Sequence, residues 1–583
     1  MPVDAATRKI VPRHVQQQSD QLAHLHPVLQ RIYQSRGINT EAELDHSLAN
    51  LPSPWLLTGI EEMTAHLAAA IRQRQNILVV ADFDADGATS CAAALQGLKL
   101  LGAERVDFIV PCRFKYGYGL TPEIVGLLQQ RQPRPQVLIT VDNGISSIDG
   151  VRLAKSLGMT VLVTDHHLPG DELPVADAIV NPNLPDDRFP GGALAGVGVI
   201  FYVLMALRKG LREQGWFQEC QIDEPNLAQL LDYVALGTVA DVVPLDYTNR
   251  ILVQQGLLRI RANRCHPGIK ALLEVADRKQ LSLTTADLGF ALAPRLNAAG
   301  RLENMALGIE CLVAEDAGEA SRVARKLDDL NRERREIEGQ MKLEALSLLD
   351  DLQAFDEKHL SAGVCLFDKN WHQGVIGILA SRIKDRLHRP VISFAPADNG
   401  EIKGSARSIA GVHIRDVLSD IAVAHPKLLS KFGGHAMAAG LTLQMHDYPA
   451  FVLAFDAMVA RQLQHLDLEQ KILSDGELTV EDISLQFAES LRQAGPWGQE
   501  FPEPVFDGVF DVVQSRIVGQ HHLKLVLRLP FNDLLIDAIA FYPEQPEQWL
   551  GVRQIRTAYQ LDINEYQGKR SVQMILQYLE RIT

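Results

Sequence analysis

The sequence predicts an α/β protein with a doubly wound parallel sheet, a second and smaller α/β domain, and a C-terminal β-barrel. Between about residues 60 and 180, short apolar runs alternate with helical stretches, which is the rhythm of a doubly wound parallel sheet. A proline-free stretch rich in Arg, Lys, Glu and Leu predicts one long helix over 315–353. Residues 500–583 hold five short strand-like runs separated by turns, which fit a small barrel.

The strands of the first domain are predicted from runs of apolar and β-branched residues. The candidates are Ile77–Val80, Val106–Ile109, Val137–Val141, Thr160–Thr164 and Ala178–Val180. Helical stretches such as Thr121–Gln130 and Ser147–Leu157 separate them. The first run is apolar throughout, which suits a strand that is buried on both faces of a parallel sheet.

We expect the chain to have five parts. We expect an N-terminal cap segment over 1–50, the first α/β domain over 51–313, a connecting helix over 314–353, the second α/β domain over 354–468, and the barrel over 469–583. The barrel strands are expected at Val505–Ser515, Leu523–Arg528, Asp537–Phe541, Gln560–Glu565 and Ser571–Leu579. Five strands in so short a segment are typical of an OB-type barrel.

The bulk composition excludes several classes of protein. The chain has 583 residues and a formal net charge of −15, which argues against a protein that coats nucleic acid indiscriminately. Six cysteines without a C-x-x-C pair fit reduced thiols in a cytosol better than disulfides or a zinc site. The first thirty residues lack the apolar run of a signal peptide, and no window reaches the ~18 apolar residues of a membrane span. We therefore expect a cytoplasmic protein without membrane association.

The stretch Ile77–Ser90 is central to the chemistry. Three carboxylates, Asp82, Asp84 and Asp86, follow the first candidate strand at alternate positions, and a helix is expected over about 88–97. Open α/β sheets place their ligands at the carboxyl ends of the strands. Three carboxylates this close together repel one another, and a divalent cation with oxygen ligands relieves that repulsion.

Two other interpretations of this stretch are an acidic surface loop and an EF-hand, whose calcium loop opens with the same D-x-D-x-D-G pattern. An EF-hand needs Glu at its twelfth position, where this chain has Ala93, and it needs a helix before the loop. On this stretch alone, the surface loop stays open.

Two more candidate strands end in polar side chains. Asp142-Asn143-Gly144 follows one of them, and Asp165-His166-His167 follows the next. A single Asp after a strand is usually a turn residue or a helix cap, and adjacent histidines usually lie on the surface. Because parallel strands deliver their carboxyl ends to one rim, three such endings on one sheet should converge. Asp241 lies in a later apolar run, where it either caps a turn before Pro244 or adds a further ligand.

Seven short motifs occur in a fixed order along the chain. They are Asp82–Ser90, Tyr118–Leu120, Asp165–His167, Leu194–Gly198, Gly237–Leu245, Pro294–Arg301 and Trp371–Gly377. This series resembles that of the DHH phosphoesterases, and within them the single-strand-specific DNA exonucleases. The D-H-H triplet alone is a weak signal, whereas the ordered series is specific. The resemblance runs from about residue 50 to the end of the chain.

The resemblance implies a metal-dependent exonuclease that degrades single-stranded DNA 5′→3′ to 5′-mononucleotides in recombination and repair. It implies two ions of Mn²⁺ or Mg²⁺, roughly 3.5–4 Å apart, that promote an in-line displacement. The implied ligands are Asp82, Asp84, Asp86, Asp142, His166 and Asp241. Asp142 would bridge the ions, with Asp82 and Asp84 at one ion and the remaining three ligands at the other.

Further roles follow from the same resemblance. The implied catalytic residues are Asp142, His166 and His167, and Asp165 and His167 would orient His166 or relay a proton. In the second α/β domain, glycine-rich turns bring backbone amides near phosphate oxygens, and Arg407 offers a forked cation. The implied substrate-binding residues are Arg113, Arg295, Ser405 and Arg407 for the 5′-terminal phosphate, and His372 and His435 for the scissile phosphate. A narrow cleft would admit one strand and reject a duplex.

The barrel and the long helix carry weaker signals. The barrel residues that suit stacking and phosphate pairing are Arg516, His522, Lys524, Arg528, Phe541 and Tyr566. A barrel whose aromatics serve only its core is the alternative, and the resemblance favours DNA binding. The basic run Arg332–Arg335 is more typical of a solvated helix face than of a DNA contact. The implied partners are single-stranded DNA, single-strand-binding protein and a RecQ-type helicase, and we expect a monomer.

Two other functions compete with this interpretation. One is a phosphoesterase of the same superfamily that acts on short oligoribonucleotides or cyclic dinucleotides. Such proteins are typically shorter and lack a terminal barrel. The other is a non-catalytic replication scaffold with a decayed site, which the presence of every expected ligand disfavours.

Overall fold

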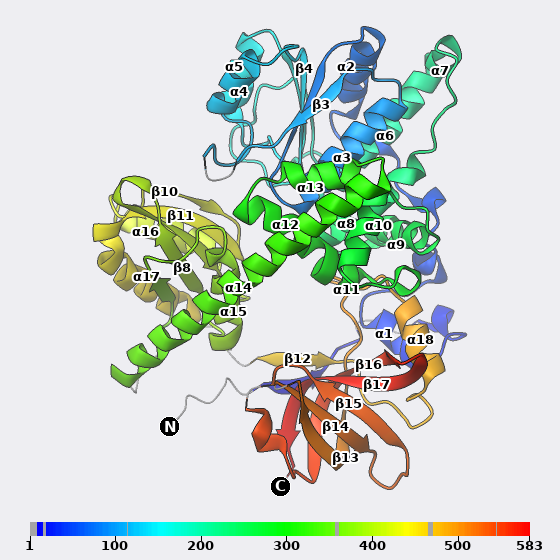
Figure 1. The fold of residues 1–583 in the computed structure, drawn as a ribbon, viewed down its shortest axis with the longest axis vertical. Helices are drawn as coiled ribbons and strands as arrows, with labels where there is room; N and C mark the ends of the chain where they lie inside the picture. Colours follow the sequence, from blue (N-terminus) through cyan, green and yellow to red (C-terminus); the bar gives the residue numbers. More distant parts are fainter. Residues whose placement is uncertain are drawn as a thin grey trace. The chain divides into compact units, whose positions relative to one another are not determined.

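The computed structural model describes residues 8–15, 19–112, 115–355, 361–464, 470–519, 521–543 and 545–582 (Figure 1). The chain divides into two compact units. The larger unit comprises Pro12–Asn331 and Leu473–Thr583, and the smaller comprises Met1–Val11 and Arg332–Ile472. Among the helices of the described ranges, none combines the length and the apolar composition that a bilayer crossing requires.

A five-stranded parallel sheet lies in the larger unit. Its strands are β2 (Ile77–Ala81), β3 (Val106–Ile109), β4 (Val137–Val141), β5 (Thr160–Thr164) and β6 (Ala178–Val180). Their order is β3-β2-β4-β5-β6, and every neighbouring pair is parallel. The five predicted strands are confirmed, with β2 one residue longer than expected. Every residue of β2 and β4 is buried, as expected for near-continuous apolar runs in a parallel sheet.

Helices cover both faces of this sheet, which confirms the doubly wound fold (Figure 1). Alternate strand residues enter different cores. Val79 and Ile139 pack with α2 (Ile60–Arg72), α3 (Ala85–Leu100) and α6 (Gly196–Glu213). Leu78 and Leu138 pack with α4 (Pro122–Gln129) and α5 (Ile148–Ser156). Successive side chains of a strand point to opposite faces of the sheet, so the apolar residues of one strand contribute to two cores.

The start of α3 differs from the sequence expectation. The helix begins at Ala85 and not near residue 88, because Asp84 is its N-cap and accepts a hydrogen bond from the Gly87 amide at 3.0 Å. Asp86 therefore lies in the first helical turn rather than in a loop.

Further helices complete this part of the larger unit. They are α1 (Pro27–Gln34), α7 (Trp216–Glu219), α8 (Leu231–Ala240), α9 (Tyr247–Arg261), α10 (Pro267–Val275), α11 (Thr285–Asp287), α12 (Ala293–Leu302) and α13 (Ala306–Val313). A π-helical turn spans Leu288–Leu292, immediately before α12. The segment expected as an N-terminal cap also bonds to the region before the barrel. Arg36 forms a fork on the buried carboxylate of Asp475 at 2.8 and 3.0 Å.

The predicted long helix is confirmed as α14 (Ala317–Phe355), a single helix of 39 residues. It begins in the larger unit, where Val323, Ala324 and Leu327 are buried. It continues into the smaller unit, where the Trp371 indole N–H donates to Glu344 at 2.9 Å.

The smaller unit is built on a mixed five-stranded sheet in the order β10-β11-β9-β8-β7. Its strands are β7 (Val364–Phe367), β8 (Val391–Pro396), β9 (Glu401–Arg407), β10 (Lys431–Gly434) and β11 (Ala438–Gln444). Its other helices are α15 (Ile376–Leu387), α16 (Ile414–Ala424) and α17 (Tyr448–Leu463). Phe394, Phe451 and Phe455 are fully buried at the centre of its core.

The C-terminal region is a closed five-stranded barrel in the order β13-β14-β15-β17-β16. Its strands are β13 (Phe506–Val518), β14 (His522–Arg528), β15 (Leu535–Ala540), β16 (Gln554–Tyr566) and β17 (Lys569–Arg581). The pair β15–β17 is parallel and the others are antiparallel. All five predicted strands are confirmed. The helix α18 (Leu485–Gln493) precedes the barrel, and β1 (Lys9–Pro12) pairs with β12 (Lys471–Ser474) in a separate small sheet.

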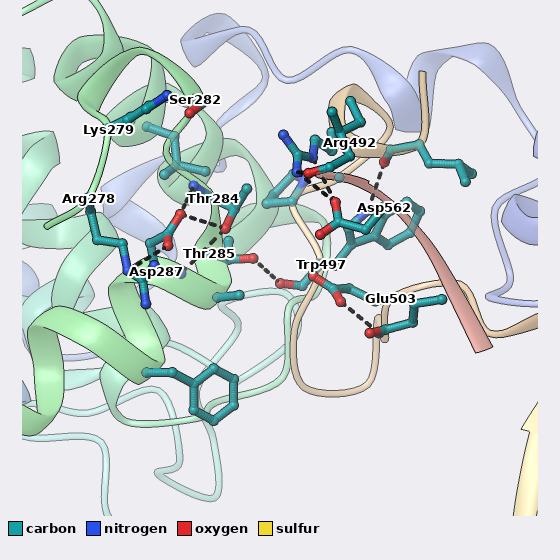
Figure 2. Close-up of a pocket in the computed structure, with 18 of the residues that line it drawn as sticks. Arg278, Lys279, Ser282, Thr284, Thr285, Asp287, Arg492, Trp497, Glu503 and Asp562 are labelled. Carbon is teal, nitrogen blue, oxygen red and sulfur yellow. Dashed lines mark hydrogen bonds and ion pairs between the residues drawn. The ribbon is translucent and has the colours of Figure 1, made fainter. Parts of the chain in front are cut away.

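A cavity of about 670 Å³ separates the barrel from the helices around α11 within the larger unit (Figure 2). Figure 2 shows Arg278 pointing toward Asp287 and Arg492 bonded to Asp562. Nε of Arg278 lies 3.3 Å from Oδ1 of Asp287, and Nη2 of Arg492 lies 2.7 Å from Oδ1 of Asp562. The Thr285 hydroxyl donates to the Trp497 carbonyl across the cavity at 2.6 Å. A further ion pair among the lining residues joins Lys279 to Glu565 of β16 at 2.9 Å. None of the expected metal ligands lines this cavity.

Candidate metal centre

Acidic and imidazole side chains gather where β2, β4 and β5 end. Three groups lie close enough to hold a cation, with one ligand atom from each member within 4.8 Å of the others. The groups are Asp82 with Asp84 and Asp142, Asp86 with His166 and Asp241, and Asp142 with His166 and His167. The structure therefore brings all six expected ligands to one rim of the sheet. Asp142 and His166 each belong to two groups.

Asp142 is the first residue after β4, and its backbone is unusual. Its φ of 62° lies in the left-handed region, which Asp tolerates better than most residues. Its amide donates to the Thr164 carbonyl of β5 at 3.1 Å. A Cβ on Gly196 would come within 2.6 Å of the Asp142 Cβ, so α6 can approach this side chain only with glycine at that position. The site is thus shaped by backbone geometry around Asp142.

Asp86 is fixed by the first turn of α6. The amides of Gly196 and Val197 donate to its Oδ2 and Oδ1 at 2.6 and 3.0 Å. The N-terminal end of a helix favours a negative charge, so these bonds lower the pKa of Asp86 and partly offset the effect of its burial. This contact explains the motif Leu194–Gly198, to which sequence reasoning had given no role.

Asp241 lies both at the end of a helix and beside another expected ligand. Asp241 is the C-cap of α8, as its position before a turn suggested. Its carboxylate Oδ2 also lies 3.5 Å from Nε2 of His166. The next residue, Val242, has a φ of 62°, a strained value for a β-branched side chain.

The electrostatics of the carboxylates fit a cation. Burial, followed by repulsion from neighbouring carboxylates, raises the pKa of Asp82, Asp142 and Asp241 well above the ordinary value. The same causes raise the pKa of Asp86 to about 7. Oδ1 of Asp82 is buried and accepts no hydrogen bond from any described residue, which is costly for a carboxylate. An oxygen-rich set with one imidazole matches Mn²⁺ or Mg²⁺.

The two histidines of the D-H-H triplet have different neighbours. Nε2 of His166 lies 3.0 Å from Oδ1 of Asp142 and faces the carboxylates. Nδ1 of His167 lies 2.7 Å from Oδ1 of Asp165, and the Tyr118 hydroxyl lies 3.1 Å from the same nitrogen. The side chain of Asp165 therefore orients the ring of His167. At His166 the same carboxylate accepts a hydrogen bond from the backbone amide, at 2.8 Å.

The pKa of His167 is raised and the pKa of its partner, Asp165, is lowered. Burial lowers the pKa of His167, but the bond to Asp165 and the surrounding acids outweigh burial and raise it to about 9. Burial raises the pKa of Asp165, but the bond from His167 and the Ile145 amide outweigh it and lower that pKa. The two residues thus form an ion pair in which the Asp165 carboxylate is buried and the His167 side chain is partly exposed.

Sequence reasoning missed three residues that fix the rim. The Asn143 amide donates to the carbonyls of Val80 and Val141 at 3.0 and 2.8 Å, which ties the ends of β2 and β4 together. The Asn297 side chain accepts from the Ala85 amide at 2.9 Å and so fixes the start of α3. The Tyr118 hydroxyl donates to the Asp142 carbonyl at 3.2 Å. The only sequence signals were that Tyr118 and Asn297 lie inside two of the seven short motifs and that Asn143 lies in the polar run after a strand.

The expected substrate-binding residues fall in both units. Ser405 and Arg407 are alternate residues of β9 on one face of the strand, and Nη1 of Arg407 lies 3.1 Å from Oγ of Ser405. His372 accepts a hydrogen bond from the Gly374 amide at 3.1 Å, and burial lowers its pKa. His435 lies exposed in the turn between β10 and β11.

Arg113 lies outside the described residues. Arg295 lies in the larger unit, where its guanidinium bonds to Asp328 of α14 at 2.7 and 2.9 Å and to the Ala291 carbonyl at 2.6 Å. In this structure Arg295 therefore anchors the start of the long helix.

Comparisons with known proteins cover nearly the whole chain. A model described as the DHH family N-terminal domain matches residues 76–238, a DHHA1 domain matches 359–461, and a RecJ OB domain matches 474–578. The chain is 51% identical over 573 residues to the single-stranded-DNA-specific exonuclease RecJ of Salmonella typhimurium, and the match covers 98% of each chain.

Two solved structures are also similar. The crystal structure of RecJ in complex with Mn²⁺ from Thermus thermophilus has a TM-score of 0.79 at 29% identity, over 97% of this chain and 78% of that one. The structure of RecJ from the same organism with Mg²⁺ has a TM-score of 0.74 at 27% identity, over 97% and 76%.

Proposed function

The chain belongs to the RecJ family of single-stranded-DNA-specific exonucleases, and we propose that it removes 5′-mononucleotides from single-stranded DNA in the 5′→3′ direction. It is a metal-dependent phosphodiester hydrolase that binds single-stranded DNA. Its participation in recombination and repair, and its place in the cytoplasm, belong to the proposal.

The observation that carries the proposal is that Asp142 and His166 share one ligand group and each belongs to a second one. Asp142 also groups with Asp82 and Asp84, and His166 also groups with Asp86 and Asp241. We assign Asp82 and Asp84 to one ion, Asp86, His166 and Asp241 to the other, and Asp142 to both. Bound Mn²⁺ or Mg²⁺ ions supply the positive charge that activates water and stabilises the leaving oxygen.

The protein's own residues prepare this site in three ways. The amides of α6 hold Asp86 in one orientation, so this carboxylate loses little freedom on binding. Asp165 keeps a proton on Nδ1 of His167 and thereby fixes the orientation of that ring. The carboxylates of Asp82, Asp86 and Asp142 are buried, and this low-dielectric setting strengthens the electrostatic interactions among them.

The smaller unit is proposed to bind the 5′ end of the DNA. Ser405 and Arg407 are already in contact and present a hydroxyl and a guanidinium that suit a phosphate. Arg113 and Arg295 are assigned to the same phosphate by family resemblance, and His372 and His435 to the scissile one. For Arg295 this role requires its guanidinium to serve a phosphate and Asp328 together, or to exchange one for the other.

The barrel is proposed to guide the strand. Phe541 and Tyr566 are 53% and 68% exposed, which suits stacking on bases better than a role in the barrel core. Among the expected basic contacts, Lys524 and Arg528 pair with Asp537 and Asp511 at 3.3 Å each, so a phosphate would compete with these surface ion pairs. Single-strand-binding protein and a RecQ-type helicase remain proposed partners, and the monomer remains the proposed state.

One digestion experiment tests the proposal. Oligonucleotides labelled at the 5′ or the 3′ end, single- and double-stranded, are incubated with the protein and Mn²⁺, Mg²⁺ or a chelator. We expect release of the 5′ label as a mononucleotide from single strands only, with no reaction in chelator. Faster turnover of a dinucleotide than of a long single strand would instead favour an oligonucleotide phosphoesterase.

A further inference from the structure

A small cavity in the smaller unit contains a second arginine. It has a volume of about 230 Å³ and is lined by Gly377, Ile378, Ser381 and Arg382 of α15 and by Arg407 of β9. The α15 residues are related by a spacing of four, so they present one face of the helix to the strand. Two guanidinium groups and a hydroxyl in one cavity offer hydrogen-bond donors with net positive charge. Such a lining suits a compact oxyanion.

The buried carboxylate of Glu338 accepts a hydrogen bond from Arg382 and fixes its position. Its Nε lies 3.0 Å from Oε1 of Glu338 on α14, and the other oxygen of Glu338 lies 2.6 Å from Nη1 of Arg334. Glu338 is only 9% exposed, whereas the Arg382 side chain is 58% exposed. This Nε bond is the only hydrogen bond of the Arg382 guanidinium within the described residues, so both terminal nitrogens remain available to a ligand.

The opposite wall of the cavity depends on a glycine. A Cβ on Gly377 would lie 2.9 Å from Nη2 of Arg407 and 2.9 Å from Oγ of Ser405. Because Gly377 has no side chain, Ser405 and Arg407 of β9 can lie close to α15, the helix that carries Arg382. Groups from both elements converge on one small volume.

We propose that Arg382 is a further specificity-determining residue, which with Arg407 binds the 5′-terminal phosphate of the DNA, and that Glu338 positions it. This inference rests on the proposed 5′-end site and adds a residue to it. A terminal phosphate carries nearly two negative charges at neutral pH, whereas an internal phosphodiester carries one. A second guanidinium therefore favours the phosphorylated end of a strand over an internal position.

The test compares single-stranded oligonucleotides that differ only in a 5′-phosphate or a 5′-hydroxyl, with the full chain and Mn²⁺. For Arg382→Ala, we expect the preference for the phosphorylated end to fall about tenfold, the effect of one charge-assisted hydrogen bond, through KM rather than kcat. Arg382→Lys should recover part of the preference. Glu338→Ala should lose more of it than Glu338→Gln, which keeps an acceptor for Nε.

Arg386→Ala is the matched control, since this exposed arginine lies one turn further along α15 and does not line the cavity. Its preference should equal that of the wild type. A wild-type protein that does not distinguish the two ends would overturn the 5′-end site itself and this inference with it. A wild-type preference that persists unchanged in both Arg382 variants would overturn only the role of Arg382.

Discussion

Nε2 of His166 lies 3.0 Å from Oδ1 of Asp142, and the two side chains are 11% and 2% exposed. They come from the ends of two neighbouring parallel strands, β5 and β4. Each also belongs to a second group of ligands, so this pair joins the two halves of the proposed metal centre. The proposed two-ion site depends on the contact between Asp142 and His166.

The first prediction concerns Asp142. Replacing it with Ala should lower the rate of single-strand hydrolysis by at least about a thousandfold, because loss of a shared ligand removes several kcal/mol of transition-state stabilisation. Binding of single-stranded DNA, measured by fluorescence anisotropy, should persist. Asp149→Ala, which alters an exposed carboxylate on α5, is the control and should be as active as the wild type. Near-normal hydrolysis by Asp142→Ala would remove the metal assignment.

The second prediction concerns pH and metal together. Because burial and neighbouring acids raise the pKa of Asp86 to about 7, the metal-free folded protein binds more protons than the unfolded chain between about pH 4 and 7. Its stability should therefore fall as pH rises through that window. Mn²⁺ replaces those protons, so it should raise Tm more at pH 8 than at pH 6, with about 2.7 kcal/mol gained at a hundred times Kd. Thermal unfolding at pH 6 and pH 8, with and without Mn²⁺, measures the rise in Tm at each pH. An equal rise at the two pH values would contradict the prediction.

A third prediction concerns Arg407. The variant Arg407→Ala should weaken the preference for 5′-phosphorylated over 5′-hydroxyl strands more than it harms folding, because the guanidinium offers a forked cation that suits a phosphate. Competition between the two substrates measures the preference. Arg415→Ala, an exposed arginine on α16, serves as the control. An unchanged preference in Arg407→Ala would exclude it from the 5′-end site.

The fourth prediction separates recognition from stability at Gly377. A methyl group here displaces the ends of two flexible side chains, Arg407 and Ser405, and no backbone atom, so Gly377→Ala should remain folded. We expect the 5′-phosphate preference to fall several-fold, with a change in Tm of only a few degrees. Gly126→Ala, where an added Cβ meets nothing within 4 Å, is the matched control. If Gly377→Ala keeps full preference, the cavity is not the phosphate site.

Much of the fold follows from local sequence. The strands of the parallel sheet and of the barrel were predictable because the spacing of apolar residues and the length of each apolar run distinguish strands from helices. The strands β2 to β6 lie at the positions predicted from the sequence. The convergence of the acids at strand ends was predictable because parallel strands share one rim. The start of α3 was misplaced because the capping role of Asp84 competes with its role as a ligand.

Other features depend on contacts between distant residues and left no local signal. The α6 amides reach Asp86 across more than a hundred positions, and Arg295 turns to Asp328. Asp165 orients the ring of His167 rather than that of His166, a choice between adjacent rings that spacing does not decide. Arg382 was missed because an exposed arginine on a helix is common, and only the buried Glu338 beside it gives it a fixed orientation.

The most direct test of the central claim is anomalous diffraction from a crystal soaked in Mn²⁺. The account predicts two peaks on opposite sides of the Asp142 carboxylate, roughly 3.5–4 Å apart, with Asp82 and Asp84 beside one and His166 and Asp241 beside the other. A single peak away from Asp142, or no peak among these side chains at a concentration that supports hydrolysis, would contradict it.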